Sequence, residues 1–183
     1  MTYPITIAGV QRELPLCTLN DQLMIGALVI FGDVELTCAC AGALLEKAPE
    51  FDYMISPEAK AIPLVHEMAR QSGRNEYIIV RKKMKAYMQD VFEVDDISIT
   101  TAGTQKLYLD GSEAAKMKGK RILLVDDVIS TGGSMRAMEH LVEEAGGIVV
   151  GRMAILAEGD AKNRDDIIFL EPLPLFNAEG QPL

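Results

Sequence analysis

The sequence contains no tryptophan and few other aromatic residues, so aliphatic side chains and methionine must fill its core. Of its 183 residues, 49% are hydrophobic, 5% are aromatic and ten are methionine. A charged fraction of 25% beside this apolar content is typical of a globular protein and excludes a disordered chain. The length suits one domain with a sizeable core, and we predict a single domain over residues 1–183.

Long apolar runs are also missing, since none approaches the roughly 18 residues that cross a bilayer. The N-terminal stretch MTYPITIAGVQREL lacks the basic start and apolar middle of a secretory signal. Cys17, Cys38 and Cys40 show none of the spacings of zinc or redox motifs. Reduced thiols are the favoured interpretation, and we expect a cytoplasmic protein without a membrane partner.

Positive charge is scarce, because 18 Lys and Arg stand against 27 Asp and Glu, which gives a formal net charge of −9. Nucleic-acid binding needs a basic face, so we expect no nucleic-acid partner. One exception is the basic segment, residues 70–85, whose only acidic residue is Glu76. It is either a solvated surface or a site for an anion. Its bases are Arg70, Arg74, Arg81, Lys82, Lys83 and Lys85.

Strands alternate with helices, which predicts an α/β fold with a mostly parallel central sheet flanked by helices. Hydrophobic periodicity predicts strands at 51–55, 77–80, 121–126, 147–156 and 166–170, and helices at 23–31, 36–47, 57–68 and 138–145. Ser56 and Pro57 are expected to supply the N-cap and first residue of the third helix. Residues 97–100 and 106–110 alternate at period two and predict a β-hairpin.

The stretch RILLVDDVISTGGSMRAM, residues 121–138, places two aspartates and a turn rich in glycine and hydroxyl groups between a strand and a helix. Ligands of open parallel sheets bind beyond the carboxyl ends of the strands, where Asp126 and Asp127 are expected. Residues 130–134, here called the glycine turn, lead into a helix N-terminus, which favours an anion. The turn matches neither a Walker loop nor the G-x-G-x-x-G fingerprint.

Two carboxylates would repel a phosphate unless another group separates the phosphate from the carboxylates. A ribose fits this requirement. Its hydroxyls would donate to Asp126 and Asp127 while its 5-phosphate sits in the glycine turn. Alternatively, the aspartates cap a turn and the glycines only bend it. The complete run is more specific than its parts, and ILLVDDVISTGGS resembles the phosphoribosyl pyrophosphate signature of type I phosphoribosyltransferases.

Further stretches extend this resemblance over roughly residues 50–157. SPEAKAIPL (56–64) resembles the family's pyrophosphate loop, with Ala61 in place of the usual glycine. VRKKMKAYM (80–88) is similar to the basic strand end of adenine- and xanthine-specific members. Residues 86–112 fall where the family has a mobile β-hairpin loop, and residues 1–50 and 158–183 where it has a small hood over the base.

The resemblance implies a glycosyltransferase (pentosyltransferase) of purine salvage, most like the adenine-specific members, that converts phosphoribosyl pyrophosphate and a purine base to a nucleoside monophosphate and pyrophosphate. It implies a homodimer and a Mg²⁺ ion carried by the substrate near the aspartates, without a direct protein ligand. The implied catalytic residues are Asp126 and Asp127. The implied phosphoribosyl pyrophosphate-binding residues are Glu58, Ala59, Lys60, Arg81, Lys82, Lys85, Ser130, Thr131, Gly132, Gly133 and Ser134.

The preferred purine base is predicted from the residues after the strand at 151–156. The carboxyl end of this strand should open onto the cleft that holds the ribose and its phosphate. Glu158 follows this strand, whereas xanthine-specific members have a lysine at the similar place. Adenine presents an amino group at C6 and needs an acceptor, so Glu158 as base-binding residue favours adenine over an oxopurine. In the alternative, Glu158 caps a turn and Phe169 or Phe176 contacts the base together with main-chain groups.

Three other functions are alternatives to this one. An enzyme for xanthine, hypoxanthine, guanine or orotate shares the same sugar-phosphate motif. A non-catalytic regulator that senses phosphoribosyl pyrophosphate would need to bind DNA, and residues 1–50 contain only Arg12 and Lys47 as bases against six acidic residues. A Rossmann-like methyltransferase or dehydrogenase lacks its glycine fingerprint. His66 and His140 fall within helical patterns and are interpreted as structural, and Asp165-Asp166 as a solvated loop.

Overall fold

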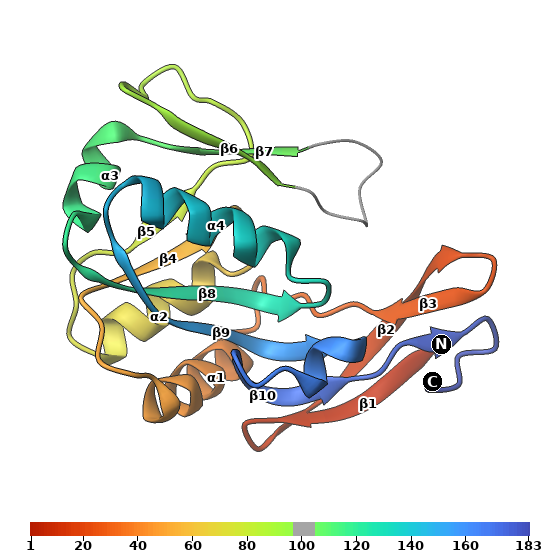
Figure 1. The fold of residues 1–183 in the computed structure, drawn as a ribbon. Coiled ribbons are helices and arrows are strands. Elements are labelled where there is room, and N and C mark those ends of the chain that lie inside the picture. The colour runs from red at the N-terminus through yellow and green to blue at the C-terminus, as the bar shows by residue number, and fades with distance from the viewer. Residues whose placement is uncertain (97–104) are drawn as a thin grey trace.

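The computed structural model describes residues 1–96 and 105–183 and confirms the α/β fold with a parallel central sheet (Figure 1). Five strands lie in the order β10-β9-β8-β4-β5, and every neighbouring pair is parallel. Their bounds are β4 Tyr53–Pro57, β5 Ile78–Val80, β8 Arg121–Ile129, β9 Ile148–Glu158 and β10 Ile168–Leu173. The strand that carries the two aspartates, β8, is therefore central.

Helices cover both faces of this sheet, as Figure 1 shows, with α3 and α4 on one side and α1 and α2 on the other. Successive strand residues point to opposite faces, so Met54 packs in the cluster with α1 and α2, and Ile55 in the cluster with α4. The helices are α1 Val34–Lys47, α2 Ile62–Gln71, α3 Gly111–Met117 and α4 Gly133–Glu144, and η1 Gly159–Asn163 is a short 3₁₀ helix.

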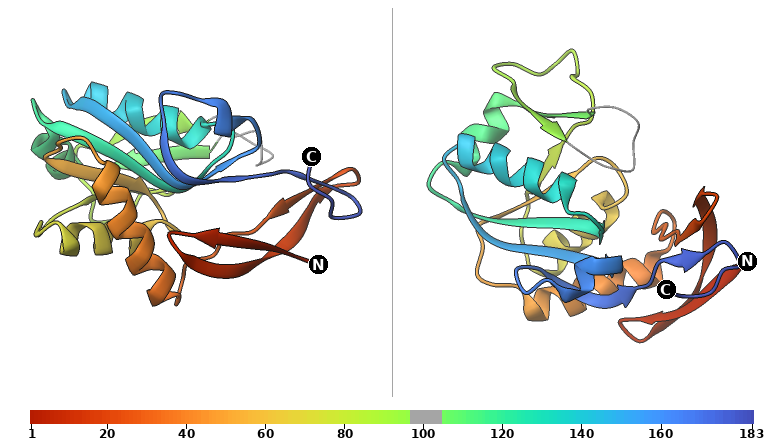
Figure 2. Two further views of the ribbon diagram at one scale, coloured as in Figure 1. Left: turned by 90° about the horizontal axis from the view of Figure 1, so that it is seen from below. Right: turned by 45° about the vertical axis from the view of Figure 1, so that its right-hand side comes forward.

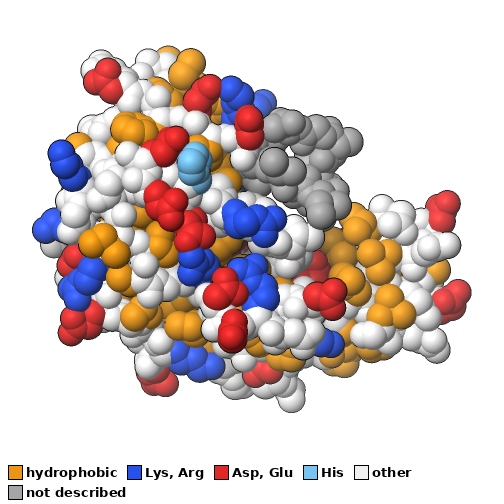
Figure 3. Space-filling model, in the orientation of Figure 1, with side chains coloured by type: hydrophobic (Ala, Val, Ile, Leu, Met, Phe, Trp, Pro, Cys, Tyr) orange, Lys and Arg blue, Asp and Glu red, His pale blue; other side chains and the backbone are white. Residues whose placement is uncertain are grey.

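A second, antiparallel sheet extends beside the central one and brings the two termini together (Figures 1 and 2). Its strands are β1 Thr2–Ile7, β2 Val10–Asn20, β3 Leu23–Gly26 and β11 Phe176–Asn177, in the order β1-β2-β3-β11. We call it the small sheet. The ring of Phe176 is fully buried and lies edge-on to Tyr3, with ring centroids 5.0 Å apart. In Figure 3 hydrophobic side chains gather over this lobe.

The predicted helix over residues 23–31 is wrong, because residues 23–26 form strand β3 between β2 and β11. Its apolar residues match a helical period, but this segment pairs antiparallel with β2 along its length and with β11 at Leu23 and Met24. The helix predicted at 36–47 is confirmed as α1, and it packs in the core with α2. Residues 1–50 thus divide between the small sheet and the central core, and the boundaries of a hood stay a prediction.

Ser56 and Pro57 do not begin a helix, which corrects a second prediction. Both residues end strand β4, paired with β5, and the amide of Glu58 continues this ladder with a bond to the carbonyl of Val80. Helix α2 begins at Ile62, with a proline in its first turn. Proline has no backbone N–H to donate, and this is tolerated both at a strand end and in the first turn of a helix. The sequence alone therefore could not decide between a strand end and a helix start at Pro57.

A β-hairpin is present in the described residues. Strand β6 (Phe92–Asp96) pairs antiparallel with β7 (Gln105–Leu109), and β7 confirms the strand predicted at 106–110. The expected strand 97–100 and turn 102–104 lie outside the described residues. Within the described ranges, no helix is long and apolar enough to span a membrane.

Candidate active site

The two aspartates lie near the carboxyl end of β8, with Lys60 beside the second one. Asp127 is only 5% exposed, and the Nζ atom of Lys60 lies 2.5 Å from its Oδ2 atom. The backbone amide of Asp127 donates to Oδ1 of Asp126 at 2.9 Å. The fold therefore brings the predicted catalytic pair and one predicted pyrophosphate residue together from segments that are far apart in the sequence.

The electrostatics of this pair disfavour two negative charges. Burial is the largest cause that raises the pKa of Asp126 well above its ordinary value, and the charge of Asp127 adds to it. The ammonium of Lys60 acts in the opposite direction but does not outweigh them. A ligand that brings hydroxyl donors or positive charge to Asp126 would relieve this repulsion.

The glycine turn follows directly after β8 and ends at the N-terminus of α4. Gly132 has a φ angle of 77° and is the N-cap of the helix, without a side-chain cap bond. This left-handed conformation favours glycine. The first turn of α4 contains no acidic residue that would repel an anion. The predicted residues Ser130, Thr131, Gly133 and Ser134 flank Gly132, so the geometry suits a phosphate at a helix N-terminus.

Two arginines that the sequence analysis missed converge on this turn. A Cβ atom built on Gly132 would collide with Nη1 of Arg164 and would lie 3.4 Å from Nη1 of Arg136. Arg136 lies four residues beyond the N-cap, a spacing that could have indicated it. Arg164 follows η1, beyond strand β9, and no local sequence signal links it to the glycine turn.

The predicted pyrophosphate loop, residues 56–64, begins at the end of β4 and meets the end of the basic segment. The Glu58–Ala59 peptide bond is cis. The amide of Lys82 donates to Glu58 at 3.1 Å, and the cationic groups of Arg81 and Lys85 lie 3.5 and 3.6 Å from its carboxylate. Burial opposes ionisation of Glu58, but these groups outweigh it and lower its pKa. Two cationic groups and one backbone amide thus surround the carboxylate of Glu58.

The rest of the basic segment serves other contacts. Arg70 binds Glu67 through two hydrogen bonds of 2.7 and 2.8 Å. Arg74 donates to the carbonyl of Phe51 and lies over its ring, 3.9 Å from the centroid. The segment predicted from composition is therefore not one anion site, and only its last part reaches the pyrophosphate loop.

Glu158 ends strand β9, and its carboxyl interacts electrostatically with Lys60 of the same site. Burial raises the pKa of its carboxyl, and the charge of Lys60 opposes this shift. Lys60 therefore lies within electrostatic range of both Asp127 and Glu158. Phe176, one of the alternative base contacts, is fully buried in the small sheet, whereas Phe169 is partly buried against the core on the α4 side.

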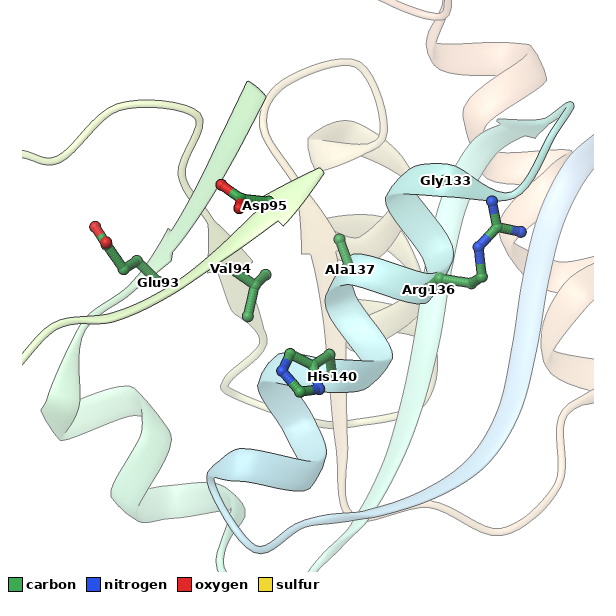
Figure 4. Close-up of a pocket in the computed structure, with 7 residues that line it drawn as sticks. All are labelled: Glu93, Val94, Asp95, Gly133, Arg136, Ala137 and His140. Carbon is green, nitrogen blue, oxygen red and sulfur yellow. The ribbon is translucent and has the colours of Figure 1, made fainter. Parts of the chain in front are cut away.

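A cavity of about 560 Å³ lies next to the glycine turn, between β6 and α4. Its charged side chains do not converge on one point in Figure 4, where Arg136 turns toward the loop before Gly133. His140 lies 3.2 Å from Glu144 on the same helix. The cavity is lined by Glu93, Val94, Asp95, Gly133, Arg136, Ala137 and His140.

No cluster of three His, Cys, Asp or Glu side chains with the geometry of a metal site exists among the described residues. Two carboxylates do lie together, and Oδ2 of Asp127 is buried without a hydrogen-bond partner, although Lys60 is close. Carboxylate oxygens are the donors that Mg²⁺ prefers. The residues present therefore fit a magnesium ion that a substrate brings with most of its ligands.

Comparison with known proteins agrees with this geometry. The family model of the phosphoribosyl transferase domain matches residues 40–175. An adenine phosphoribosyltransferase of Thermotoga petrophila is 38% identical over 109 residues, which are 60% of each chain. A hypoxanthine/guanine phosphoribosyltransferase of Methanohalophilus mahii is 37% identical over 112 residues, 61% of this chain and 54% of that one. The chain thus spans about 60% of the length of the first of these relatives.

Solved structures share the fold. The crystal structure of an adenine phosphoribosyltransferase from Rhodothermus marinus superposes with a TM-score of 0.66 over 94% of each chain, at 23% sequence identity. This match extends over the small sheet as well as the central one. At this identity the likeness establishes the architecture alone.

Proposed function

The chain belongs to the phosphoribosyl transferase domain family, and from this premise we propose that it transfers the phosphoribosyl group of phosphoribosyl pyrophosphate to adenine, forming AMP and pyrophosphate. The observation that carries the proposal is the meeting of Asp126, Asp127 and Lys60 at the strand end before the glycine turn. A sugar phosphate is the ligand whose hydroxyls and phosphate match this order of groups.

The aspartates act on the ribose. Their carboxylates accept hydrogen bonds from the ribose hydroxyls and lie near the positive charge that develops when the bond from C1 to pyrophosphate breaks. The repulsion that raises the pKa of Asp126 in the free protein favours a ligand that donates hydrogen bonds. Ionised carboxylates that are held in place stabilise this charge without reorganisation at the moment of reaction.

The leaving pyrophosphate is bound by positive charge from two segments. Lys60 exchanges its ion pair with Asp127 for the pyrophosphate oxygens, and Arg81, Lys82 and Lys85 supply further charge from the neighbouring strand end. Glu58 keeps Arg81 and Lys85 together before the substrate arrives. Asp126 and Asp127 would hold a magnesium ion that arrives with the substrate, and this ion would help to neutralise the leaving group.

Glu158 accepts the C6 amino group of adenine in this proposal. The carboxyl is half-buried at the end of β9. The charge of Lys60 acts on it as it does on the aspartates. An oxopurine would place its own acceptor opposite this carboxylate and leave both unpaired. The adenine-specific name of the Thermotoga relative agrees with this choice.

An oxopurine-specific enzyme is the second candidate, because the Methanohalophilus relative is named for hypoxanthine and guanine. Steady-state assays with adenine, guanine, hypoxanthine and xanthine separate the two. We expect the highest kcat/KM for adenine, with AMP and pyrophosphate as products. A preference for any oxopurine would end the adenine proposal, and binding of phosphoribosyl pyrophosphate without turnover of any base would favour the sensor.

We also propose a cytoplasmic homodimer. The support for a dimer is the exposure of Val29, Phe31 and Val34, which are 56, 51 and 71% exposed beside the start of α1. The support for the location is that Cys17, Cys38 and Cys40 are all free thiols. Light scattering coupled to size exclusion measures the mass directly, and a monomer at micromolar concentration would contradict the dimer.

A further inference from the structure

Two guanidinium groups from separate elements meet at the glycine turn. Arg136 lies in the first turns of α4, and Arg164 follows η1 after strand β9. Nη1 of each lies near the point that a side chain of residue 132 would occupy, and only glycine leaves that point free. Figure 4 shows the guanidinium of Arg136 turned toward the loop before Gly133.

Arg164 is held with one donor group directed at the turn. Its Nε and Nη2 atoms donate to the two carboxylate oxygens of Asp166 at 2.8 and 2.6 Å. This bidentate pair fixes the plane of the guanidinium. Within the described part of the chain, Nη1 has no hydrogen-bond partner, although it lies against Gly132.

Arg136 is held in a different way and is not neutralised. Its Nη1 atom donates to the carbonyl of Thr131 at 3.0 Å, which ties the side chain to the turn. No carboxylate among the described residues lies within ion-pair distance of Arg136. The turn therefore receives an uncompensated charge from Arg136, an oriented donor from Arg164 and the positive end of the α4 dipole.

We propose that Arg136 and Arg164 bind the 5-phosphate of phosphoribosyl pyrophosphate, and that Asp166 is the positioning residue of Arg164. The inference rests on the proposed function and adds side-chain ligands to the backbone groups of the turn. The charge of Arg136 has no carboxylate partner among the described residues, Nη1 of Arg164 is a donor directed at the same turn, and guanidinium groups match the oxygens of a phosphate. The side chains thereby select a phosphorylated ribose over ribose itself.

Calorimetric titration with two probes tests the inference. Ribose 5-phosphate contains only the 5-phosphate, and pyrophosphate with magnesium occupies only the opposite end of the site. We expect Arg164→Gln and Arg136→Gln each to weaken ribose 5-phosphate binding about tenfold or more, the effect of a lost charge-assisted hydrogen bond. Pyrophosphate affinity should stay within about twofold of the wild type in both variants.

Matched variants distinguish binding from structure. Arg121 forms a similar pair with Asp52 at the opposite end of β8, so Arg121→Gln should leave both affinities unchanged. Asp166→Asn should weaken ribose 5-phosphate binding less than Arg164→Gln does, and Arg164→Lys should restore part of it because the charge remains. In turnover assays, the KM for phosphoribosyl pyrophosphate should rise in Arg164→Gln more than kcat falls.

Two outcomes overturn the inference, and they differ from each other. If the wild type binds ribose 5-phosphate while Arg136→Gln and Arg164→Gln bind it equally well, the arginines are not ligands and the proposed function stands. If the wild type binds neither ribose 5-phosphate nor phosphoribosyl pyrophosphate, the proposed function fails and the inference with it. Because Arg136 and Arg164 lie on separate elements, a folding defect in one variant leaves the other as an independent test.

Discussion

At the scale of single residues, the site depends on carboxylates that the protein holds in an unfavourable state. Asp126 is adjacent to Asp127 in the sequence, and both lie in a central strand where solvation is limited. Lys60 offsets part of the charge of Asp127 through its ion pair. Groups of this kind lower the stability of the free protein and are retained where a ligand benefits from them.

Asp126→Asn is expected to stabilise the free protein at neutral pH. The folded-state pKa is raised above the ordinary value of 3.8, so the folded state binds more protons than the unfolded state between these two values. Stability therefore falls as pH rises through this window, and the cost remains at higher pH. Calorimetric melting at pH 4 and pH 7 should show a larger gain for the variant at pH 7, together with weaker phosphoribosyl pyrophosphate binding.

Asp165→Asn is the control for that measurement, because Asp165 is exposed in the loop before β10. It should change neither the melting temperature nor ligand binding. A variant at Asp126 that melts below the wild type at both pH values would show that the carboxylate stabilises the fold, contrary to the argument from burial.

Gly132→Ala should impair both the fold and the site. The φ angle of 77° costs a non-glycine residue about 1–2 kcal/mol, and the new Cβ would displace Arg164. Gly73→Ala is the matched control, since Gly73 has a φ angle of 70° and no atom near its Cβ position. Urea unfolding should show a similar loss in both variants, whereas only Gly132→Ala should lose phosphoribosyl pyrophosphate affinity. Equal ligand binding in the two would place the phosphate elsewhere.

Glu158→Gln should change the choice of base more than the affinity for the sugar. Without a full carboxylate acceptor, kcat/KM for adenine is expected to fall about tenfold, the effect of one hydrogen bond to a charged group. Glu158→Lys should lower it further and reduce the preference over xanthine. Calorimetry with phosphoribosyl pyrophosphate is the control, and its affinity should stay within about threefold. Unchanged selectivity in both variants would move the base site away from β9.

At the scale of elements, the unit formed by β8, the glycine turn and α4 could be predicted because its signals are local. Apolar residues at 122–125 mark the strand, and the glycines mark the turn before the helix. The closure of the small sheet by β11 could not be predicted in the same way, since residues 23 and 24 pair with residues 177 and 176, about 150 positions later. Arg164 and Lys60 reach the site by tertiary packing, which sequence spacing does not show.

The contact between α1 and α2 gives a pH-dependent prediction. Hydrogen bonds from Arg70, the largest cause, and from Gln71 lower the pKa of Glu67 to about 2, against an ordinary value of 4.5. The side-chain amide of Gln71 also donates to the carbonyl of Cys38 on α1. A lowered carboxyl pKa contributes stability that is present above about pH 4.5 and lost as pH falls toward 2.

Glu67→Gln is therefore expected to destabilise the protein at pH 7 and to melt close to the wild type at pH 2. Glu46→Gln, at an exposed position of α1, serves as the control with no change at either pH. Thermal unfolding followed by circular dichroism between pH 2 and pH 7 measures the difference. A gap between variant and wild type that is constant over this range would show that the loss comes from packing and not from the charge.

At the scale of the whole molecule, the ligand site draws on segments from most of the chain. Asp127 lies in β8 and Glu158 at the end of β9, whereas Lys60 lies between β4 and α2 and Arg164 between η1 and β10. A site of this kind exists only in the folded state, because the unfolded chain cannot bring these segments together. Binding should therefore be visible as stabilisation of the entire fold.

Phosphoribosyl pyrophosphate with magnesium is expected to raise the melting temperature without any base. A ligand at 100 times its Kd adds about 2.7 kcal/mol, and a chain of this length gains about 2–4 °C per kcal/mol, so the shift should be about 5–10 °C. Differential scanning fluorimetry measures it, with inorganic phosphate as the ligand control and Asp126→Asn/Asp127→Asn as the protein control. The double variant should keep its fold and show a much smaller shift. An equal shift with inorganic phosphate, or an undiminished one in the double variant, would mean that the ribose is not recognised and would remove the basis of the assignment.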